Sequence, residues 1–309
     1  MRVEANRQKL SADSRFEFCK AHEFPERYLA RLHPYHDFIK WTSQGITGDE
    51  EAVYPDLFPG EGAHLPRRFD NPLWGGLFCT DAVTPIMRRT YEVARGSAEA
   101  AMTGASLLLE SGHREVYALC RPSGHHAGPR VFGGYCYFNN AATAAELLSP
   151  SGKVAILDID YHHGNGTQEF FEDRRYVFTA SIHGDPQKEY PYYWGYADEK
   201  GKWKGKATNL TVPLEIGSGK DEYLLAVEKV KEAIESFGPD YFIISAGFDT
   251  FAGDPIGGFK LAVEDYEQVG RSLGQINKPV LICQEGGYNL DVLGQCVYGF
   301  LDGLLSGRK

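Results

Sequence analysis

Short apolar runs alternate with helical stretches along the chain from Thr84 onward. The apolar runs are Val116 to Cys120, Val154 to Leu157, Tyr176 to Ile182, Tyr241 to Ser245 and Val280 to Cys283. The helical stretches are Pro85 to Glu110, Asn139 to Leu148, Thr167 to Asp173, Asp221 to Phe237, Val263 to Ile276 and Leu290 to Leu305. Because the apolar runs are not interrupted by polar residues, we expect strands that are buried on both faces. The sequence therefore predicts an α/β fold with a mostly parallel sheet flanked by helices.

The first part of the chain differs from the rest in composition and in hydrophobic pattern. Residues 45–76 are rich in Gly, Pro and aromatic side chains and have neither a helical nor a strand period. We therefore expect a long loop insertion there, within an atypical N-terminal part covering residues 1–80. No repeat or low-complexity linker divides the chain, so we interpret residues 1–309 as a single domain.

Composition and charge argue against several classes of function. With 42% hydrophobic and 24% charged residues the chain can bury a core, and its net charge of -10 argues against a nucleic-acid partner. No apolar run is long enough to span a membrane, and charged residues occupy the start of the chain, where a secretory signal needs apolar ones. The six cysteines form no CxxC pair, which favours reduced thiols. We expect a cytoplasmic protein with no membrane partner.

Chemically active residues follow each of the five predicted strands, next to glycines. The exits read RPSGHHAG (121–128), DIDYHHGNG (158–166), HGD (183–185), AGFD (246–249) and QEGGY (284–288). If the strands are parallel neighbours, these residues meet at one edge of the sheet, where α/β folds bind their ligands.

Each position taken singly has an ordinary explanation as a helix cap or a surface residue. The Asp158-x-Asp160-x-His162 run also resembles the start of an EF-hand, but the glycine needed at the sixth place is His163 and a strand precedes the run. The glycines near Lys220 lack the spacing of a phosphate-binding loop. Five independent coincidences would be needed to dismiss the convergence.

The convergent residues fit a catalytic metal site. Alternate residues of an extended segment point the same way, so Asp160 and His162 can reach one ion, and Asp249 supplies a third ligand from another strand exit. Three protein ligands with an open position are typical of catalytic Zn²⁺, which activates water and polarises a carbonyl.

The remaining polar residues then have roles in amide hydrolysis. His125 and His126 are suited to move protons to and from the water and the leaving amine. Asp158 and Asn165 would orient these imidazoles, and the Tyr288 hydroxyl could meet the oxyanion.

With these residues the chain resembles the zinc-dependent histone deacetylase and acetylpolyamine amidohydrolase family, which has an arginase-like three-layer α/β fold. The matching segments are RPSGHHAG (121–128), GGYCYFNN (133–140), LDIDYHHGNGT (157–167), SIHGD (181–185), SAGFDTFAGDP (245–255) and EGGYN (285–289). They occur in the expected order over most of the chain.

The resemblance implies roles for individual residues. Asp160, His162 and Asp249 would be the ligands of one Zn²⁺, with Fe²⁺ as the alternative metal. His125 with Asp158 would act mainly as an electrostatic partner, His126 with Asn165 as general base and acid, and Tyr288 would polarise the carbonyl. A structural K⁺ is also implied, held by Asp158, Asp160, His162, Ser181 and Ile182. Asn165 and the EGGYN segment point to class II enzymes and bacterial amidohydrolases.

The substrate side is also implied by the resemblance. Gly134, Tyr135 and Tyr190 resemble the walls of an acyl-lysine tunnel, and Asp70 and Asp81 are the acidic candidates at the rim. The HGDP segment (183–186), Tyr190 and the insertion at 45–76 resemble acetylpolyamine amidohydrolases, in which that insertion narrows the entrance across a homodimer interface. The family usually has a strand and a helix before the region of Phe24 to Leu32, so we expect a sheet edge that is missing or rebuilt.

We therefore predict a Zn²⁺ amidohydrolase that deacetylates an acetylpolyamine or another small acylated amine. One alternative keeps the chemistry and acts on acetyl-lysine in proteins. A less favoured alternative is a non-catalytic protein that binds an acylated ligand. An arginase-type enzyme with two Mn²⁺ ions would need more carboxylates to bridge the metals, and the tandem His residues and Tyr288 argue against it.

Overall fold

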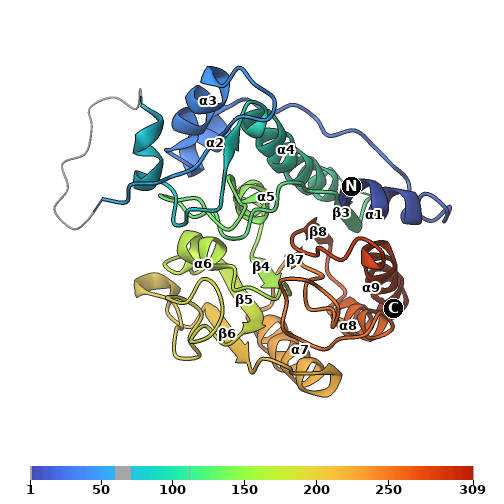
Figure 1. Ribbon diagram of the computed structural model, residues 1–309. Coiled ribbons are helices and arrows are strands. Elements are labelled where there is room, and N and C mark those ends of the chain that lie inside the picture. The colour runs from blue at the N-terminus through green and yellow to red at the C-terminus, as the bar shows by residue number, and fades with distance from the viewer. Residues whose placement is uncertain (1, 60–70, 111, 309) are drawn as a thin grey trace.

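The computed structural model describes residues 2–59, 71–110 and 112–308, and its centre is a six-stranded sheet (Figure 1). The strand order is β3 (Glu115–Ala118), β8 (Val280–Gln284), β7 (Tyr241–Ala246), β4 (Val154–Asp158), β5 (Val177–Gly184) and β6 (Asn209–Leu214). Every neighbouring pair in this sheet is parallel. The predicted α/β class with a parallel sheet is confirmed.

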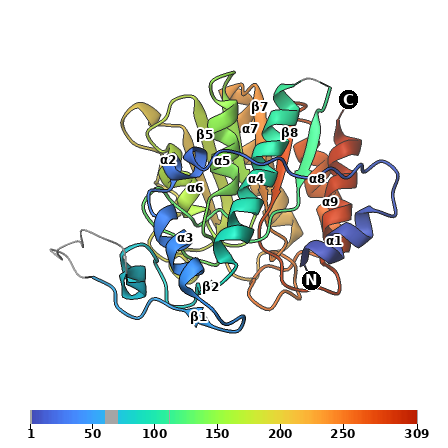
Figure 2. The same ribbon diagram turned by 90° about the horizontal axis from the view of Figure 1, so that it is seen from above.

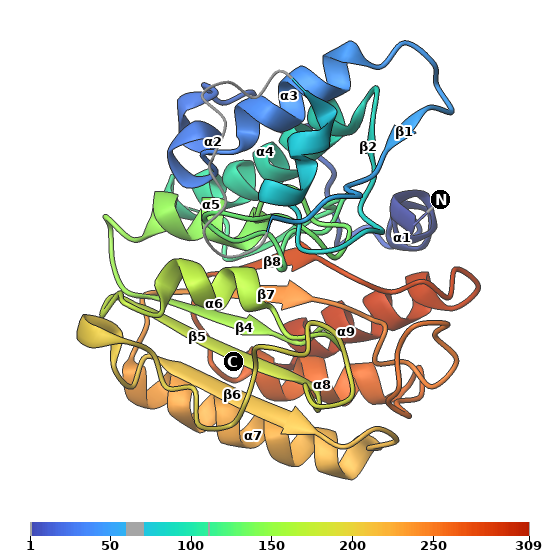
Figure 3. The ribbon, with the colours of Figure 1, turned by 60° about the vertical axis from the view of Figure 1, so that its left-hand side comes forward.

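Helices cover both faces of the sheet. On one side lie α4 (Thr90–Leu109), α5 (Asn140–Leu148) and α6 (Asn165–Phe171), and on the other α7 (Lys220–Phe237), α8 (Asp265–Gly274) and α9 (Leu293–Gly307) (Figure 3). Alternate residues of β4 belong to different cores: Val154 and Ile156 pack with α4 and α5, whereas Ala155 and Leu157 pack with α7 to α9. None of the helices in the described ranges is both long and apolar enough to cross a membrane.

The N-terminal part forms helices around the sheet. These are α1 (Arg2–Leu10), α2 (Arg27–Leu32) and α3 (His36–Gly45). Helix α1 lies beside α9 (Figure 2), with Leu10 in the main core and the Asn6 amide donating to Gln284 Oε1 at 3.0 Å. The sheet ends at β3 on this side, and α1 reaches past it to the end of β8.

Several predicted boundaries are wrong. The helix predicted from Pro85 begins at Thr90, because β2 (Ile86–Met87) pairs antiparallel with β1 (Ala52–Val53). This β1 strand and a 3₁₀ helix, Pro72–Leu77, interrupt the loop predicted over 45–76. The helices predicted over Thr167 to Asp173 and Leu290 to Leu305 are α6 and α9, displaced by two or three residues.

One strand of the six-stranded sheet was not predicted. In β6 the apolar residues Leu210, Val212 and Leu214 alternate with polar residues and Pro213, so no continuous apolar run marks it. This pattern is typical of an edge strand, where a proline costs no ladder bond on the open side. A second 3₁₀ helix, Trp203–Gly205, precedes it.

Candidate active site

The carboxyl ends of the parallel strands surround a cavity of about 210 Å³. Its lining residues are Asp81, Val83, Ser123, His125, His126, Gly134, Tyr135, Asp160, His162, Tyr190, Ile256 and Tyr288. Three of the five predicted strand exits therefore line this cavity, and Asp249 of a fourth exit contacts His162. No residue of the HGD exit (183–185) is among the lining residues. Val83, Ser123 and Ile256 were not singled out in the sequence, because an aliphatic side chain or a single hydroxyl carries no signal of its own.

Three donor side chains meet at the floor of the cavity. His162 Nδ1 lies 3.3 Å from Asp160 Oδ1 and 3.3 Å from Asp249 Oδ2. Two ligands of a tetrahedral Zn²⁺ at ~2.0 Å also lie ~3.3 Å apart. Although Asp249 Oδ2 is fully buried, no hydrogen bond to it is formed among the described residues. The donor types and their spacing fit a Zn²⁺ ion.

Neighbouring backbone groups hold the two carboxylates in place. Asp160 Oδ2 accepts a hydrogen bond from Gly286 N at 2.8 Å, and Asp249 Oδ1 accepts one from Tyr161 N at 2.9 Å. A Cβ on Gly286 would lie only 2.3 Å from Asp249 Oδ2, so this close approach requires glycine. Each carboxylate therefore keeps its other oxygen directed at His162.

Asp160, His162 and Asp249 strongly affect one another's pKa values. Burial lowers the pKa of His162, but its close contacts with the Asp160 and Asp249 carboxylates outweigh burial and raise it to about 10. Burial and the Asp160 charge raise the pKa of Asp249 to about 6. A cationic imidazole thus compensates the carboxylates, a role that a divalent cation would take over.

The tandem histidines have different partners. His125 Nδ1 lies 2.9 Å from Asp158 Oδ2, and His126 Nδ1 lies 2.8 Å from Asn165 Oδ1. Burial lowers the pKa of His125, but the Asp160 and Asp158 charges outweigh burial and raise it well above its usual value. The pKa of His126 is held well below its usual value by burial and by the His125 charge. One ring therefore favours the charged form and the other the neutral form.

The Tyr288 hydroxyl stays protonated. Burial raises its pKa well above the ordinary value, and its ring carries the Arg2 guanidinium at 4.8 Å from the centroid. Its backbone N–H donates to Asp254 Oδ2 at 2.6 Å. Asp254 was not predicted as a site residue, although it lies in the SAGFDTFAGDP segment and is the second carboxylate after β7.

Four of the five residues predicted to bind substrate line the cavity, namely Asp81, Gly134, Tyr135 and Tyr190. Asp81 Oδ2 accepts from Gly134 N at 2.6 Å and from the Thr84 hydroxyl at 3.0 Å, so this carboxylate also anchors the Gly134–Tyr135 turn. Tyr135 is 44% exposed, and the Tyr190 ring stands perpendicular to His126 with centroids 4.8 Å apart. Asp70 lies outside the described residues.

Three of the five residues predicted to hold potassium lie on adjacent strands, and Asp160 and His162 follow the first of these strands. Asp158 at the end of β4 is opposite Ser181 on β5, and Ile182 is the next residue of β5. Ser181 Oγ is 2.8 Å from His183 Nδ1. The strand pairing thus explains their proximity.

Comparison with known proteins identifies the family of this chain. A model of the histone deacetylase domain matches residues 2–304, so the chain belongs to the histone deacetylase family. It is 40% identical over 292 residues to acetylpolyamine amidohydrolase 1 of Pseudomonas aeruginosa, covering 91% of this chain and 83% of that protein. It is 43% identical to the acetylpolyamine amidohydrolase of Mycoplana ramosa, over 86% of this chain and 77% of that protein.

The fold is shared with solved structures. The acetylpolyamine aminohydrolase of Burkholderia pseudomallei superposes with a TM-score of 0.93 at 31% identity, covering all of this chain and 91% of that one. The HD domain of HDA15 gives a TM-score of 0.81 at 30% identity, covering 98% and 83%. The arginase and deacetylase-like fold implied by the sequence motifs is confirmed.

Proposed function

We propose that this protein hydrolyses the amide of a small acylated amine, most specifically an acetylpolyamine, to acetate and the free amine. The observation that carries the proposal is the Asp160, His162 and Asp249 donor set, two members of which line the cavity beside two imidazoles with oppositely shifted pKa values. Relatives named acetylpolyamine amidohydrolases, at 40–43% identity, support the substrate class.

The proton transfers are assigned to His126. Its Nδ1–H donates to Asn165 Oδ1, which leaves the Nε2 lone pair to accept a proton from the attacking water. The same nitrogen then returns this proton to the leaving amine. His125, paired with the Asp158 carboxylate, remains cationic and stabilises negative charge that develops on the substrate.

Tyr288 is assigned to the carbonyl oxygen. Its hydroxyl stays protonated at neutral pH, so it can donate a hydrogen bond to the oxyanion. When bound by the Asp160, His162 and Asp249 set, Zn²⁺ would polarise the carbonyl and lower the pKa of water. Fe²⁺ is the alternative metal, and K⁺ is proposed for the site between β4 and β5.

The rim is assigned to the amine side of the substrate. Tyr135 and Tyr190 form apolar walls for an acyl-alkyl chain, and the Asp81 carboxylate places negative charge at the edge of the cavity. An alkylammonium group is favoured by that charge and by aromatic faces.

The test is acetate release by the Zn²⁺-loaded protein. N-acetylputrescine and N-acetylcadaverine are compared with an acetyl-lysine peptide at equal concentrations. We expect turnover of the free acetylpolyamines with a kcat/KM at least ~10-fold above that of the peptide. Preference for the peptide would favour the protein deacetylase alternative, and no turnover of any acylamine would reject the proposed function.

A further inference from the structure

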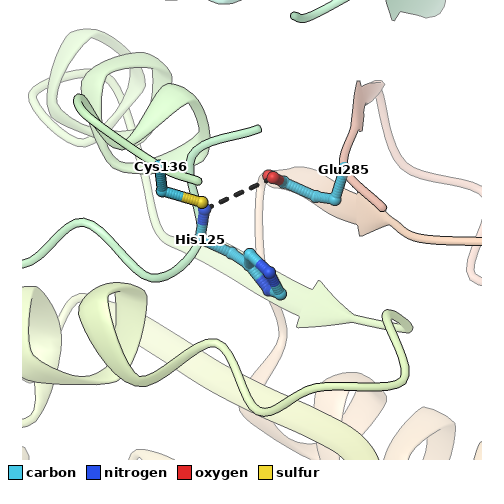
Figure 4. Close-up of side chains that lie close together, drawn as sticks. All are labelled: His125, Cys136 and Glu285. Carbon is cyan, nitrogen blue, oxygen red and sulfur yellow. Dashed lines mark hydrogen bonds between the residues drawn. The ribbon is translucent and has the colours of Figure 1, made fainter. Parts of the chain in front are cut away.

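A second set of buried donors lies beside the catalytic residues. One ligand atom each of His125, Cys136 and Glu285 lies within 4.8 Å of the others. In Figure 4 the Cys136 thiol and the Glu285 carboxyl point to the same space beside the backbone nitrogen of His125. Cys136 and Glu285 have no exposed surface, and His125 is 3% exposed. Bulk water therefore does not solvate these groups.

Glu285 is only half satisfied by the protein. Its Oε2 accepts hydrogen bonds from Gly124 N at 2.7 Å and from His125 N at 3.3 Å. Its Oε1 has no hydrogen-bond partner among the described residues. A buried carboxyl oxygen without a partner costs ~1–3 kcal/mol or more. This unpartnered atom points to a ligand that the protein itself does not supply.

The donor types specify the ligand. The Asp158 carboxylate occupies Nδ1 of His125, so Nε2 is the ring nitrogen left to coordinate a metal. A metal ion would displace the protons of the Cys136 thiol and of His125 Nε2. The resulting thiolate, carboxylate and neutral imidazole together carry two negative charges, which one divalent cation balances. Sulfur and imidazole ligands favour Zn²⁺ over Mg²⁺ or Ca²⁺.

We propose that this His-Cys-Glu cluster is a second, weaker site for a divalent cation such as Zn²⁺, and that filling it inhibits the enzyme. Inhibition follows because the cation takes His125 away from the substrate. Weaker binding follows because His125 Nε2 lies only 3.9 Å from Asp160 Oδ1, a ligand of the first site, so two cations would repel each other. The ion can enter through the cavity, which His125 lines.

The first measurement is the metal stoichiometry of the full chain. The protein is dialysed against rising Co²⁺ or Zn²⁺, and bound metal is counted by elemental analysis. We expect two equivalents, the second binding more weakly. With Co²⁺, the second equivalent produces a thiolate-to-metal charge-transfer band, because the Asp160, His162 and Asp249 set contains no sulfur. With Zn²⁺, the second equivalent coincides with loss of hydrolysis.

Variants then assign the site. Cys136→Ser and Glu285→Gln are expected to keep the first equivalent, whereas the second binds at least ~10-fold more weakly. Cys136→Ser also loses the charge-transfer band. Cys19→Ser is the matched control, because Cys19 is an exposed thiol, and it should keep the band. Circular dichroism verifies the fold of each variant.

The binding claim stands apart from the proposed function, and only the inhibition rests on it. A single equivalent without a sulfur band, in a protein that hydrolyses acylamines, overturns the second site and leaves the function intact. A band that persists in Cys136→Ser, or a second equivalent unchanged in both variants, also overturns it. A sulfur band in a protein that hydrolyses no acylamine rejects the function alone.

Discussion

Replacing Asn165 by Asp should move the pH profile of hydrolysis. The substitution keeps the oxygen that accepts from His126 Nδ1 at 2.8 Å but adds a negative charge, and both side chains are at least 93% buried. Charges ~4 Å apart interact by ~4 kcal/mol at an effective dielectric constant of ~20. Part of this is lost to desolvation of the new carboxylate, which leaves an increase of ~1–3 units in the pKa of His126.

The direction of the pH shift follows because His126 must accept a proton from water. A general base works in its neutral form, so the acidic limb of the kcat/KM profile follows its pKa. In the Asn165→Asp variant this limb should move to higher pH by ~1–3 units, and the rate at the alkaline plateau should change less. Initial rates of acetate release from pH 5 to 9 measure the shift.

The control is the same Asn-to-Asp substitution at Asn289, which lies on another loop. Asn289 donates to Gly253 O and contacts neither imidazole, so Asn289→Asp should leave the acidic limb in place. Metal content is measured for both variants. If Asn165→Asp retains its metal but its acidic limb coincides with that of the unmodified protein, His126 is not the base.

Three further predictions follow from buried contacts. In Gly134→Ala, at φ 56°, the new Cβ would lie 2.3 Å from His126 Cδ2, so kcat should fall at least ~10-fold; an unchanged kcat would contradict the rim geometry. Burial lowers the pKa of His33 to about 3 from 6.5, so its proton is lost on folding and stability falls by ~1.4 kcal/mol per pH unit as pH drops from 6.5 towards 3. Urea unfolding at pH 7, 6 and 5 should give a free energy of unfolding that depends less on pH in His33→Gln than in the unmodified protein. An equal pH dependence in the two proteins would refute the assignment. Asp249→Ala should lose bound metal and hydrolysis together; retention of both at normal levels would overturn the metal site.

The buried strands and their polar exits could be predicted from sequence because each signal is local. Continuous apolar runs mark β4, β5, β7 and β8, and the residue types at the exits limit the chemistry. Strand β6 gave no such run, because its alternate residues Asn209 and Thr211 are polar. Both are buried and donate hydrogen bonds to carbonyls of the segment that covers this face, Glu199 O and Tyr196 O. The late start of α4 at Thr90 depends on the pairing of Ile86 with Val53, a contact between distant residues that no local pattern records.

Within the site, residue types were easier to predict than their partners. The importance of Asp254 depends on a hydrogen bond to Tyr288 N from a different loop, so its position in the sequence gave no reason to choose it. Asp81 was predicted to face the substrate, but its carboxylate also anchors Gly134 and Thr84. Such hydrogen bonds are set by tertiary structure, because both partners must first be brought together by the sheet.

The tandem histidines show why partners decide function here. His125 and His126 are adjacent, follow the same strand and are both buried, so neither residue type nor burial distinguishes them. The difference comes from elsewhere: the end of β4 supplies a carboxylate to His125, and the start of α6 supplies a neutral amide to His126. Because a charge stabilises an imidazolium and an amide does not, one short segment provides both a fixed cation and a neutral base. The role of each imidazole is therefore set by one oxygen acceptor, which is why a single Asn-to-Asp change is expected to alter the chemistry without altering the shape.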